Sequence, residues 1–393
     1  MTTDPIVFLS FARTPMGGFL GELSSLSATE LGGIAVRGAV ARAALAPDQV
    51  ERCYMGCVLP AGLGQAPARQ AAIRGGLPHS VEATTVNKMC GSAMQAAILA
   101  SDTLAAKSAD VIVVGGMESM SNAPYLSPRH RAGARMGHDR MLDSMFLDGL
   151  EDAYEQGKLM GAFAEEVAGE YRFTRAKQDE FAIASLSRAL GHADRLANEI
   201  VPVTVKGRKG ETRVDTDEQP RNADPAKIPT LKPAFAKDGT ITAANASSIS
   251  DGAAALVMTR MSVAERLGVT PIARVAGHAA FAQEPARFTT APVGASRRAL
   301  EMAGWDIGQV DLFEVNEAFA TVAMIAMHDL SIPHDVLNIH GGACALGHPI
   351  GASGARILGA LINGLQVNGL RRGLAAICLG GGEATAMAVD LVQ

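Results

Sequence analysis

The sequence is poor in aromatic residues, which make up 4% of its 393 residues, and it has no excess of positive charge. Its 35 Lys and Arg are outnumbered by 40 Asp and Glu, which gives a net charge of −5. Such a chain has no general attraction for nucleic acid or for an acidic membrane surface. The apolar run at 318–327 is about half the ~20 residues that a bilayer requires, so it predicts a buried helix. We therefore expect neither nucleic-acid binding nor membrane insertion.

Cysteines are few, and their pattern excludes several kinds of site. The five cysteines are an odd number with irregular spacing, which is not typical of a disulfide framework. The sequence has no clustered Cys/His pairs, no GxxxxGK[ST] phosphate loop and no strand-linked GxGxxG, so we expect no metal and no nucleotide cofactor. The first residues show no basic region followed by an apolar stretch, so no signal peptide is expected. Free thiols then favour a cytoplasmic location.

Glycine is abundant, with 42 residues, and 48% of the chain is apolar. The chain is longer than a domain with a single hydrophobic core usually is, which indicates two or three domains. Short apolar runs alternate with longer periodic segments, a pattern typical of α/β layers. Strands are predicted at 7–9, 81–86, 111–114, 312–315, 336–339 and 374–379, and a final element of unassigned type at 384–392. Helices are predicted at 28–45, 94–106, 318–327 and 352–365, the first capped by Ser27 and the last starting at Pro349.

The segment 119–242 differs from the rest, because prolines and charges interrupt its periodicity. Amphipathic helices are predicted at 165–171 and 179–198. Within 201–240, eight Lys/Arg accompany six Asp/Glu, which fits either a solvated insertion or a phosphate-binding surface. Outside this segment, a strand followed by a double glycine occurs at 111–116 and again at 375–381. That repetition fits an ancient duplication or a coincidence, and the sequence alone does not decide.

Four segments contain residue types suited to chemistry. Cys90 follows a predicted strand and precedes a helix, where the positive end of the helix dipole would lower its thiol pKa; a buried structural cysteine is the alternative. His348 lies among five glycines and is placed to exchange a proton with a thiol. Cys378 precedes a triple glycine whose amides, including that of Gly380, can point at an oxyanion. Asn316 either binds a water or a carbonyl, or caps the next helix.

These segments together resemble the thiolase family, enzymes that form or cleave 3-ketoacyl-CoA. The resemblance covers nearly the whole chain through the motifs FARTPMG, NKMCGSA, GGMESMSNAPY, MGAFAEEVA, TAANASSISDGAAA, VNEAFA, GGACALGHPIGASG and CLGGGEA. Among the branches of this family, the motifs most resemble those of the acetyl-CoA acetyltransferases. The implied fold is a duplicated five-layered αβαβα sandwich with an inserted loop domain. The implied domains are an N-terminal half at 1–118 plus 243–270, a loop domain at 119–242, and a C-terminal half at 271–393.

The resemblance also implies a role for each candidate residue. Cys90 would accept the acyl group, His348 would activate it, and Cys378 would be the second acid/base. His348 and a water bound by Asn316 would stabilise the enolate oxygen, and the amides of Cys90 and Gly380 would stabilise the tetrahedral intermediate. Substrate contacts are implied at Ser247 near the pantetheine, at Arg221 near the adenine, and at Leu159, Met160, Ala318 and Phe319. CoA thioesters would be substrates, with no separate cofactor.

The implied assembly is a homotetramer, with 120–150 resembling the family's tetramerisation loop. Four positions depart from the family pattern: Leu159 for His, Ala93 for Gly, Glu383-Ala384 for Met-Gly or Gln-Gly, and His340 for Asn. They remove no catalytic group but leave acyl chain length open. We therefore expect acetoacetyl-CoA formation from two acetyl-CoA, the alternative being a broader 3-ketoacyl-CoA thiolase of fatty-acid degradation. More distant alternatives are a decarboxylative ketoacyl synthase and a CoA-binding protein without activity.

Overall fold

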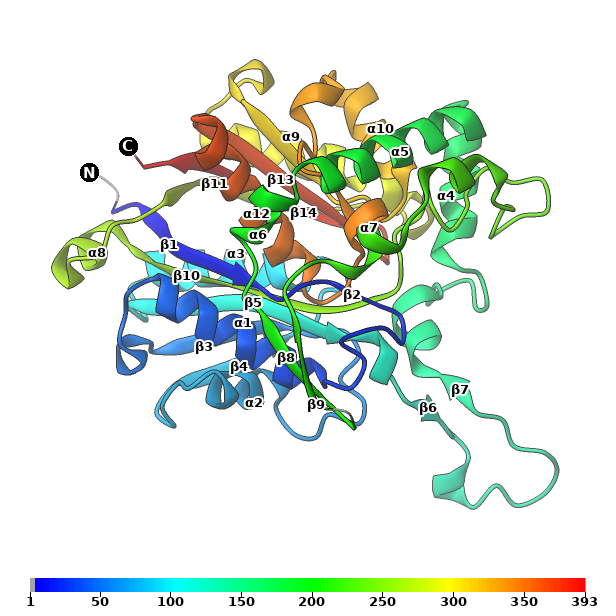
Figure 1. Cartoon of the computed structure of the whole chain (residues 1–393), viewed down its shortest axis with the longest axis horizontal. Coiled ribbons are helices and arrows are strands. Elements are labelled where there is room, and N and C mark those ends of the chain that lie inside the picture. The colour runs from blue at the N-terminus through cyan, green and yellow to red at the C-terminus, as the bar shows by residue number, and fades with distance from the viewer. Residues whose placement is uncertain (1–3, 209, 393) are drawn as a thin grey trace.

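The computed structural model describes residues 4–208 and 210–392, and its centre is one extended mixed sheet (Figure 1). In the described part of the chain this sheet has ten strands in the order β12-β13-β14-β11-β1-β10-β5-β3-β4, with β2 beside β10. Only two residue pairs, Val7 with Arg274 and Phe8 with Ala273, join β1 to β11. The sheet therefore consists of two halves that meet at a short seam.

The strands and helices of the first half come mainly from the first 120 residues. They are β1 (Ile6–Arg13), β2 (Gly17–Gly18), α1 (Ala28–Arg42), β3 (Arg52–Gly56), α2 (Pro67–Arg74), β4 (Glu82–Val86), α3 (Ser92–Ala105), β5 (Val111–Ser119), β10 (Ser250–Arg260) and α8 (Met261–Leu267). The second half contains β11 (Ala273–Ala282), α9 (Ala291–Ala303), β12 (Leu312–Val315), α10 (Ala320–Leu330), α11 (Ala343–Leu346), α12 (Ser353–Asn368), β13 (Arg372–Leu379) and β14 (Glu383–Leu391).

The two halves share one topology, which supports the duplication. In the first half β3 is parallel to β5, β5 is antiparallel to β10, and β10 is antiparallel to β1. In the second half β12, β13, β14 and β11 repeat the same pairings in the same order. Helix α3 precedes β5 as α12 precedes β13, so the two helices occupy equivalent places.

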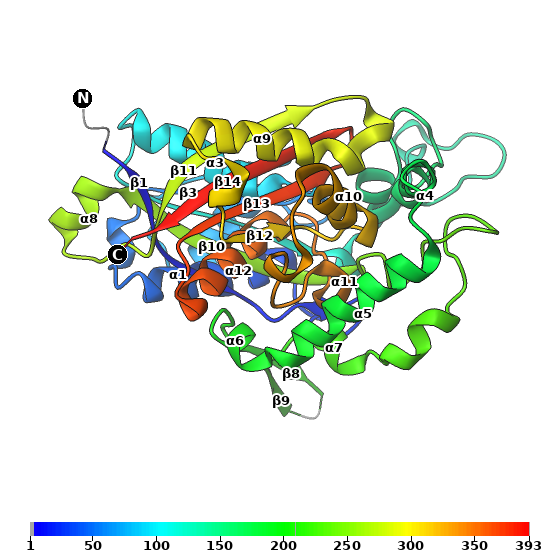
Figure 2. The same ribbon diagram turned by 90° about the horizontal axis from the view of Figure 1, so that it is seen from above.

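Five layers of secondary structure pack through three large hydrophobic clusters, of which the central one surrounds the middle layer of helices. Helices α1 and α2 pack on the outer face of the first half, and α9 and α10 pack on the outer face of the second. Helices α3 and α12 contact each other and both halves of the sheet (Figure 2). The order of layers is therefore helices, sheet, helices, sheet, helices, as the fold prediction requires.

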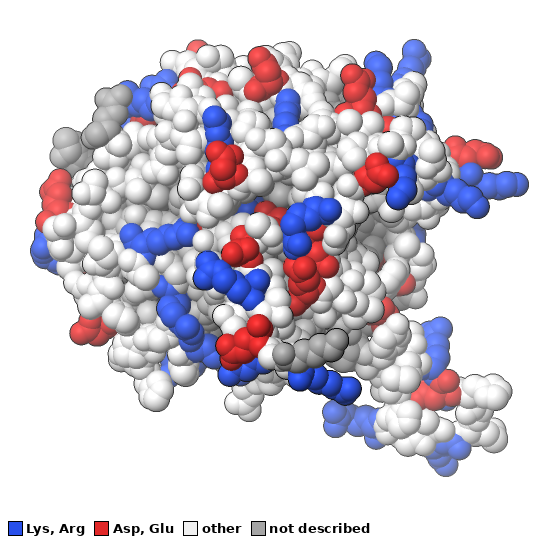
Figure 3. All heavy atoms as spheres, viewed as in Figure 1, with Lys and Arg blue, Asp and Glu red and all other residues white. Residues whose placement is uncertain are grey.

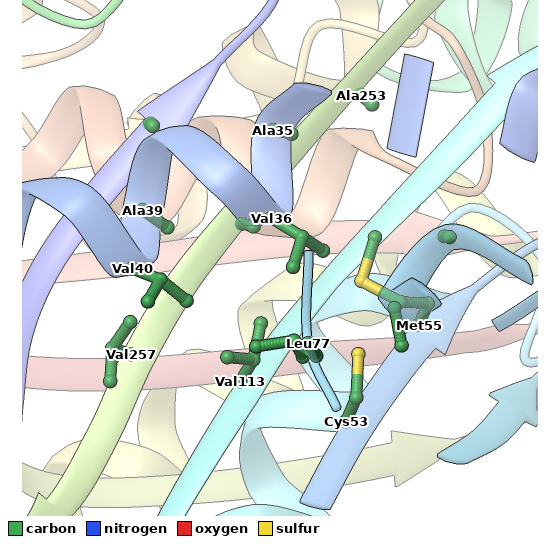
Figure 4. Packing of buried hydrophobic residues seen from close by; sticks show 14 of the residues in the cluster. Ala35, Val36, Ala39, Val40, Cys53, Met55, Leu77, Val113, Ala253 and Val257 are labelled. Atoms are coloured by element: carbon green, nitrogen blue, oxygen red, sulfur yellow. The ribbon is translucent and has the colours of Figure 1, made fainter. Parts of the chain in front are cut away.

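The strands are buried on both faces, and alternate side chains enter different layers. In β10, Ala253 and Val257 belong to the cluster beneath α1, while Ala254 and Leu256 belong to the central cluster. Figure 4 shows Val36 and Val40 of α1 packed over this surface. In β13 the same alternation places Cys378 in the cluster next to α9 and α10, and its neighbours Ile377 and Leu379 in the central cluster.

Most predicted elements are confirmed, with boundaries shifted by a few residues. The Ser27 cap is present, because its hydroxyl accepts the Glu30 N–H and the Glu30 carboxylate accepts the Ser27 N–H. The predicted strand 312–315 coincides with β12. The sequence analysis missed β10 and β11, whose many alanines and glycines gave no clear strand signal, and it missed α9.

Three local predictions are wrong. The strand at 111–114 does not stop at the double glycine but continues to Ser119, because Gly115 and Gly116 lie against neighbouring backbone. The strand predicted at 336–339 is reduced to one parallel bridge between Phe313 and Leu337, and Asn338 has φ of 48°, which interrupts an extended chain. Pro349 lies in the turn before α12, which starts at Ser353.

The segment between β5 and β10 contains α4 (Met160–Glu170), α5 (Arg175–Gly191), α6 (Ala193–Ala197) and α7 (Glu218–Asn222), with hairpins β6–β7 (Tyr125–Leu126, Leu142–Asp143) and β8–β9 (Val203–Gly207, Gly210–Val214). The β6–β7 segment projects from the body of the molecule (Figure 1). Basic and acidic side chains both lie on this projection, and both charge signs are interspersed on the rest of the visible face (Figure 3). The division into domains at 118, 242 and 270 stays a prediction.

Within 4–208 and 210–392, every helix is too short or too polar to cross a membrane.

Candidate active site

One cavity of about 370 Å³ brings together most of the predicted site residues. Its lining includes Cys90, His348, Cys378 and Gly380, which come from the turns or strand ends of both halves. The remaining lining is mostly apolar, and it includes the predicted substrate contacts Leu159, Met160, Ser247, Ala318 and Phe319. Of the predicted residues, Asn316 and Arg221 are outside the lining. Segments from opposite ends of the sequence thus form one compartment.

The turn that contains Cys90 links β4 to α3 and is held in an unusual conformation. Met89 has φ of +46°, a region that L residues rarely occupy. The Ser92 hydroxyl donates to the Met89 carbonyl at 2.6 Å and accepts the Lys88 N–H at 2.9 Å, which fixes the turn. Gly91 is required where it lies, because a Cβ there would meet Leu379 Cδ2 at 2.2 Å.

The protonation state expected for Cys90 is wrong. Burial raises the pKa of its thiol to about 11, although the Gly380 and Cys90 backbone N–H groups act in the opposite direction. The loss of water around the thiolate therefore raises the pKa of Cys90 more than the N–H groups at the start of the helix lower it. Burial also raises the pKa of Cys378 well above its ordinary value, and the nearby Cys90 adds to this shift. Both sulfurs are neutral thiols in the free protein at neutral pH.

His348 is buried and is held through its backbone and one ring nitrogen. Its N–H lies 3.2 Å from both Ser250 Oγ and the Ser248 carbonyl. Its Nδ1 lies 2.5 Å from Ser353 Oγ, and that hydroxyl is also 3.0 Å from the Pro349 carbonyl. When Ser353 donates to this carbonyl, it accepts the Nδ1–H, and Nε2 then carries the lone pair. Nε2 has no hydrogen-bond partner among the described residues.

The His348 ring is neutral at physiological pH. Burial, together with the positive charge of Arg356, lowers its pKa to about 3. A neutral ring with a free Nε2 lone pair can accept a proton. The geometry therefore provides a base beside two neutral thiols.

Cys378 and Gly380 belong to the tip of the β13–β14 hairpin. Cys378 is the penultimate residue of β13 and pairs with Ala384, and Leu379 pairs with Glu383. The turn between them consists of three glycines, and Gly381 and Gly382 have φ of 90° and 83°. The Gly380 N–H points toward the Cys90 sulfur. The two catalytic turns are therefore in direct contact.

Asn316 lies immediately beyond β12 and is fully buried. Its Oδ1 accepts a hydrogen bond from Arg356 Nη2 at 3.3 Å, which assigns the amide orientation because a guanidinium only donates. Its Nδ2 is buried and has no partner among the described residues. The amide N–H₂ group is thus available to a water or ligand. It does not cap a helix, since α10 begins four residues later with no side-chain cap.

The predicted substrate contacts lie on two adjacent segments. The Ser247 N–H donates to the Ala318 carbonyl at 3.0 Å, and Ala246 forms an antiparallel bridge with Phe319. Arg221 lies apart from them, with Nη2 at 2.6 Å from the Glu22 carboxylate. Its predicted contact with the adenine stays a prediction.

A second cavity of about 230 Å³ adjoins the first, since Ala243 and Ser248 line both. It is lined by α5, α7 and α11 and contains one basic residue, Lys227. The second cavity therefore lies between the first and part of the charged segment 201–240, from which Gln219, Ala223, Asp224, Lys227, Ile228 and Leu231 contribute to its lining.

Glu118 is an important residue near the site that the sequence analysis did not single out. Its buried carboxylate accepts N–H groups from Val58 at 2.9 Å, Leu59 at 3.1 Å and Gly351 at 2.9 Å. Burial raises its pKa to about 7. It fastens the turn that follows His348 to the end of β3. Its signal in the sequence was an acidic residue within an otherwise apolar strand, 111–119.

Within the described ranges 4–208 and 210–392, no group of three or more His, Cys, Asp or Glu residues could hold a metal ion.

Comparisons with known proteins agree over the whole chain. A model of the thiolase N-terminal domain matches residues 6–262, and a model of the thiolase C-terminal domain matches residues 269–391. Acetyl-CoA acetyltransferase of Allochromatium vinosum is 46% identical over 98% of this chain and 99% of its own. Acetyl-CoA acetyltransferase 1 of Arabidopsis thaliana is 47% identical over 99% of this chain and 94% of its own. The Schizosaccharomyces pombe acetyl-CoA acetyltransferase is 44% identical over the full length of both.

Proposed function

Because this chain belongs to the thiolase family of acyltransferases, we propose that it condenses two acetyl-CoA into acetoacetyl-CoA and CoA, reversibly, through an acetyl-Cys90 intermediate. The observation that carries the proposal is the single cavity shared by Cys90, His348, Cys378 and Gly380. The relatives that carry the name acetyl-CoA acetyltransferase support the acetyl substrate.

The first half-reaction starts from neutral groups. The Cys90 thiol gives its proton to His348 Nε2 as its sulfur forms a bond to the acyl carbon. The N–H groups of Cys90 and Gly380 stabilise the tetrahedral oxyanion, each such donor being worth roughly 2.7–4 kcal/mol in comparable sites. The bond from the acyl carbon to the CoA sulfur then breaks, and the leaving thiolate takes the proton of Cys378. Acetyl-Cys90, a Cys378 thiolate and protonated His348 remain.

The second half-reaction returns every group to its initial state. The Cys378 thiolate removes a proton from the methyl carbon of a second acetyl-CoA. The enolate oxygen accepts hydrogen bonds from His348 Nε2–H and from a water bound to Asn316 Nδ2. The enolate carbon attacks acetyl-Cys90, and the departing Cys90 sulfur recovers its proton from His348. This order explains how two thiols with raised pKa values serve as nucleophile and base.

The acyl chain length is tested by thiolysis. We expect acetoacetyl-CoA to be cleaved with a higher kcat/KM than 3-ketohexanoyl-CoA. A strong preference for the longer substrate would instead favour the broader 3-ketoacyl-CoA thiolase. Leu159 and Met160 line the cavity where the family's acetyl-specific members have a histidine before Met-Gly, so a Leu159→His variant is the matched comparison.

The second cavity adjoins the first, and this supports binding of the CoA portion of the substrate there. The pantetheine would pass Ser247, the phosphates would approach Lys227, which lines the second cavity, and the adenine would lie near Arg221. Affinity for CoA should then weaken as salt increases, whereas affinity for a neutral pantetheine thioester should not.

We also propose a homotetramer in the cytoplasm, with no nucleic-acid or membrane partner. Exposed apolar residues on the projecting segment 120–150, namely Tyr125, Met136 and Met141, support an assembly role for it. Sedimentation of a variant with a shortened β6–β7 segment tests this, and a tetramer that persists would overturn it.

A further inference from the structure

The nucleophile turn and the triple-glycine turn are joined by an ion pair outside the cavity lining. Lys88 Nζ contacts the Glu383 carboxylate, and the two residues are 295 positions apart in sequence. Lys88 lies two residues before Cys90, and Glu383 is the first residue after Gly380–Gly382. Their side chains are 25% and 35% exposed. Glu383 is one of the positions where this chain departs from the thiolase pattern.

The triple-glycine turn is intrinsically flexible, because glycine loses more conformational freedom on folding than any other residue. The N–H of Gly380 can stabilise an oxyanion only if it is held in position before the reaction. Three contacts hold this turn at its base. Glu383 pairs with Leu379 across the hairpin, the Gly382 carbonyl accepts the Gln283 N–H at 2.9 Å, and Lys88 binds the Glu383 side chain.

These contacts differ in which parts of the molecule they connect. The Leu379 and Gln283 contacts connect parts of the second half to one another. Leu379, which lines the cavity, packs against Gly91 and so connects the two halves. The contact is close, because a Cβ added to Gly91 would lie 2.2 Å from Leu379 Cδ2. The Lys88–Glu383 pair is a polar contact between the same two turns, and neither residue lines the cavity. It connects Glu383, the first residue of β14 after the triple-glycine turn, to the turn that carries Cys90.

We propose that Lys88 and Glu383 are a pair of positioning residues that fix the Gly380 N–H relative to the Cys90 sulfur. This inference rests on the proposed function, in which those two groups act on the same tetrahedral intermediate. It adds a determinant specific to this chain, since the pair requires the unusual glutamate. Neither side chain needs to touch the substrate.

The test measures acetyl transfer and condensation in Lys88→Met, Glu383→Met and the double variant. We expect each single change to lower kcat for acetyl transfer by about two- to five-fold, equivalent to about 0.4–1 kcal/mol, with KM for acetyl-CoA unchanged. The double variant should be no slower than the slower single variant, because only one interaction is lost. The reversed pair Lys88→Glu with Glu383→Lys should recover most of the activity.

A matched control is the cross-strand pair Arg52–Glu82 at the start of β3 and β4, which lines neither cavity. Glu82→Met should leave kcat unchanged. Additive losses in the double variant, a failed charge reversal in a protein with unaltered melting temperature, or a change in KM alone would each overturn the proposal. Failure of the proposed function has a different signature, because the unmodified protein would then make no acetoacetyl-CoA.

Discussion

The carbonyl oxygen of Gly351 faces Gly116 so closely that a methyl group at position 116 would lie 1.9 Å from it. Gly116 is in β5 of the first half, and Gly351 follows His348 in the second. Glu118, two residues along the same strand, accepts the Gly351 N–H. The turn that follows His348 therefore packs against β5 through its backbone. This close approach is possible because residue 116 has no side chain.

The first prediction follows from this contact. Gly116→Ala should destabilise the protein by more than about 3 kcal/mol, because either the strand or the histidine turn must move, and residual folded protein should have lower kcat. Thermal unfolding and thiolysis rates measure both effects. Gly169→Ala is the control, since Gly169 is exposed in α4 and a Cβ added to it would meet nothing beyond its own helix within 4 Å; it should raise stability by about 0.5–1 kcal/mol. Equal effects at both sites would contradict the interpretation.

The second prediction separates the two sulfurs. Cys90→Ala should abolish the acetyl-enzyme, which mass spectrometry of the intact protein detects after incubation with acetyl-CoA. Cys378→Ala should retain detectable acetyl transfer while losing condensation, because no other group is proposed to remove the α-proton. Normal condensation by Cys378→Ala would show that the proposed division of roles is wrong.

The third prediction concerns the pH dependence of Cys90. Because its pKa is raised to about 11, the thiolate fraction should increase about tenfold per pH unit between pH 7 and 10. The rate of Cys90 alkylation by iodoacetamide in the absence of CoA should follow that increase. Peptide mapping identifies the alkylated residue, and Cys90→Ser supplies the background. A rate already constant at pH 7 would indicate the lowered pKa that the helix N-terminus alone suggests.

The fourth prediction tests the support of His348. Ser353→Ala removes the group that accepts Nδ1–H, and it should lower kcat by about ten- to a hundred-fold, since hydrogen bonds to charged groups contribute ~1.5–3 kcal/mol. The effect should fall on the steps in which His348 is protonated, so kcat should change more than KM. Ser296→Ala, a buried serine of α9, is the control for loss of a buried hydroxyl. Equal losses in both variants would show a merely structural role.

The sequence predicted much of the architecture because local signals and tertiary packing agree there. Ser27 and the periodic residues after it specify α1, and the β-branched run beginning at Val111 specifies the start of β5. The prediction failed where backbone contacts between distant segments decide the conformation. Gly115 and Gly116 looked like a strand end, yet they continue β5 because a neighbouring strand and the Gly351 carbonyl occupy the space of their missing side chains.

The sequence identified the residues of the candidate site, but it did not predict their protonation states. Motif order pointed to Cys90, His348 and Cys378, and all three line one cavity. The protonation state of Cys90 depends on how much water the folded chain removes from its sulfur, and that burial is a property of the assembled layers. The contributions of Glu118 and Ser353 likewise depend on contacts with segments far away in sequence.

The two halves repeat one topology, and the site combines the turn before α3 with the turn before α12. A polypeptide of half this length, pairing with an identical copy, would already have brought two such turns together. In the present chain the two equivalent turns carry different groups, a sulfur at Cys90 and an imidazole at His348. Because both turns belong to one polypeptide, a substitution in one of them leaves its counterpart unchanged, which an assembly of two identical copies could not allow.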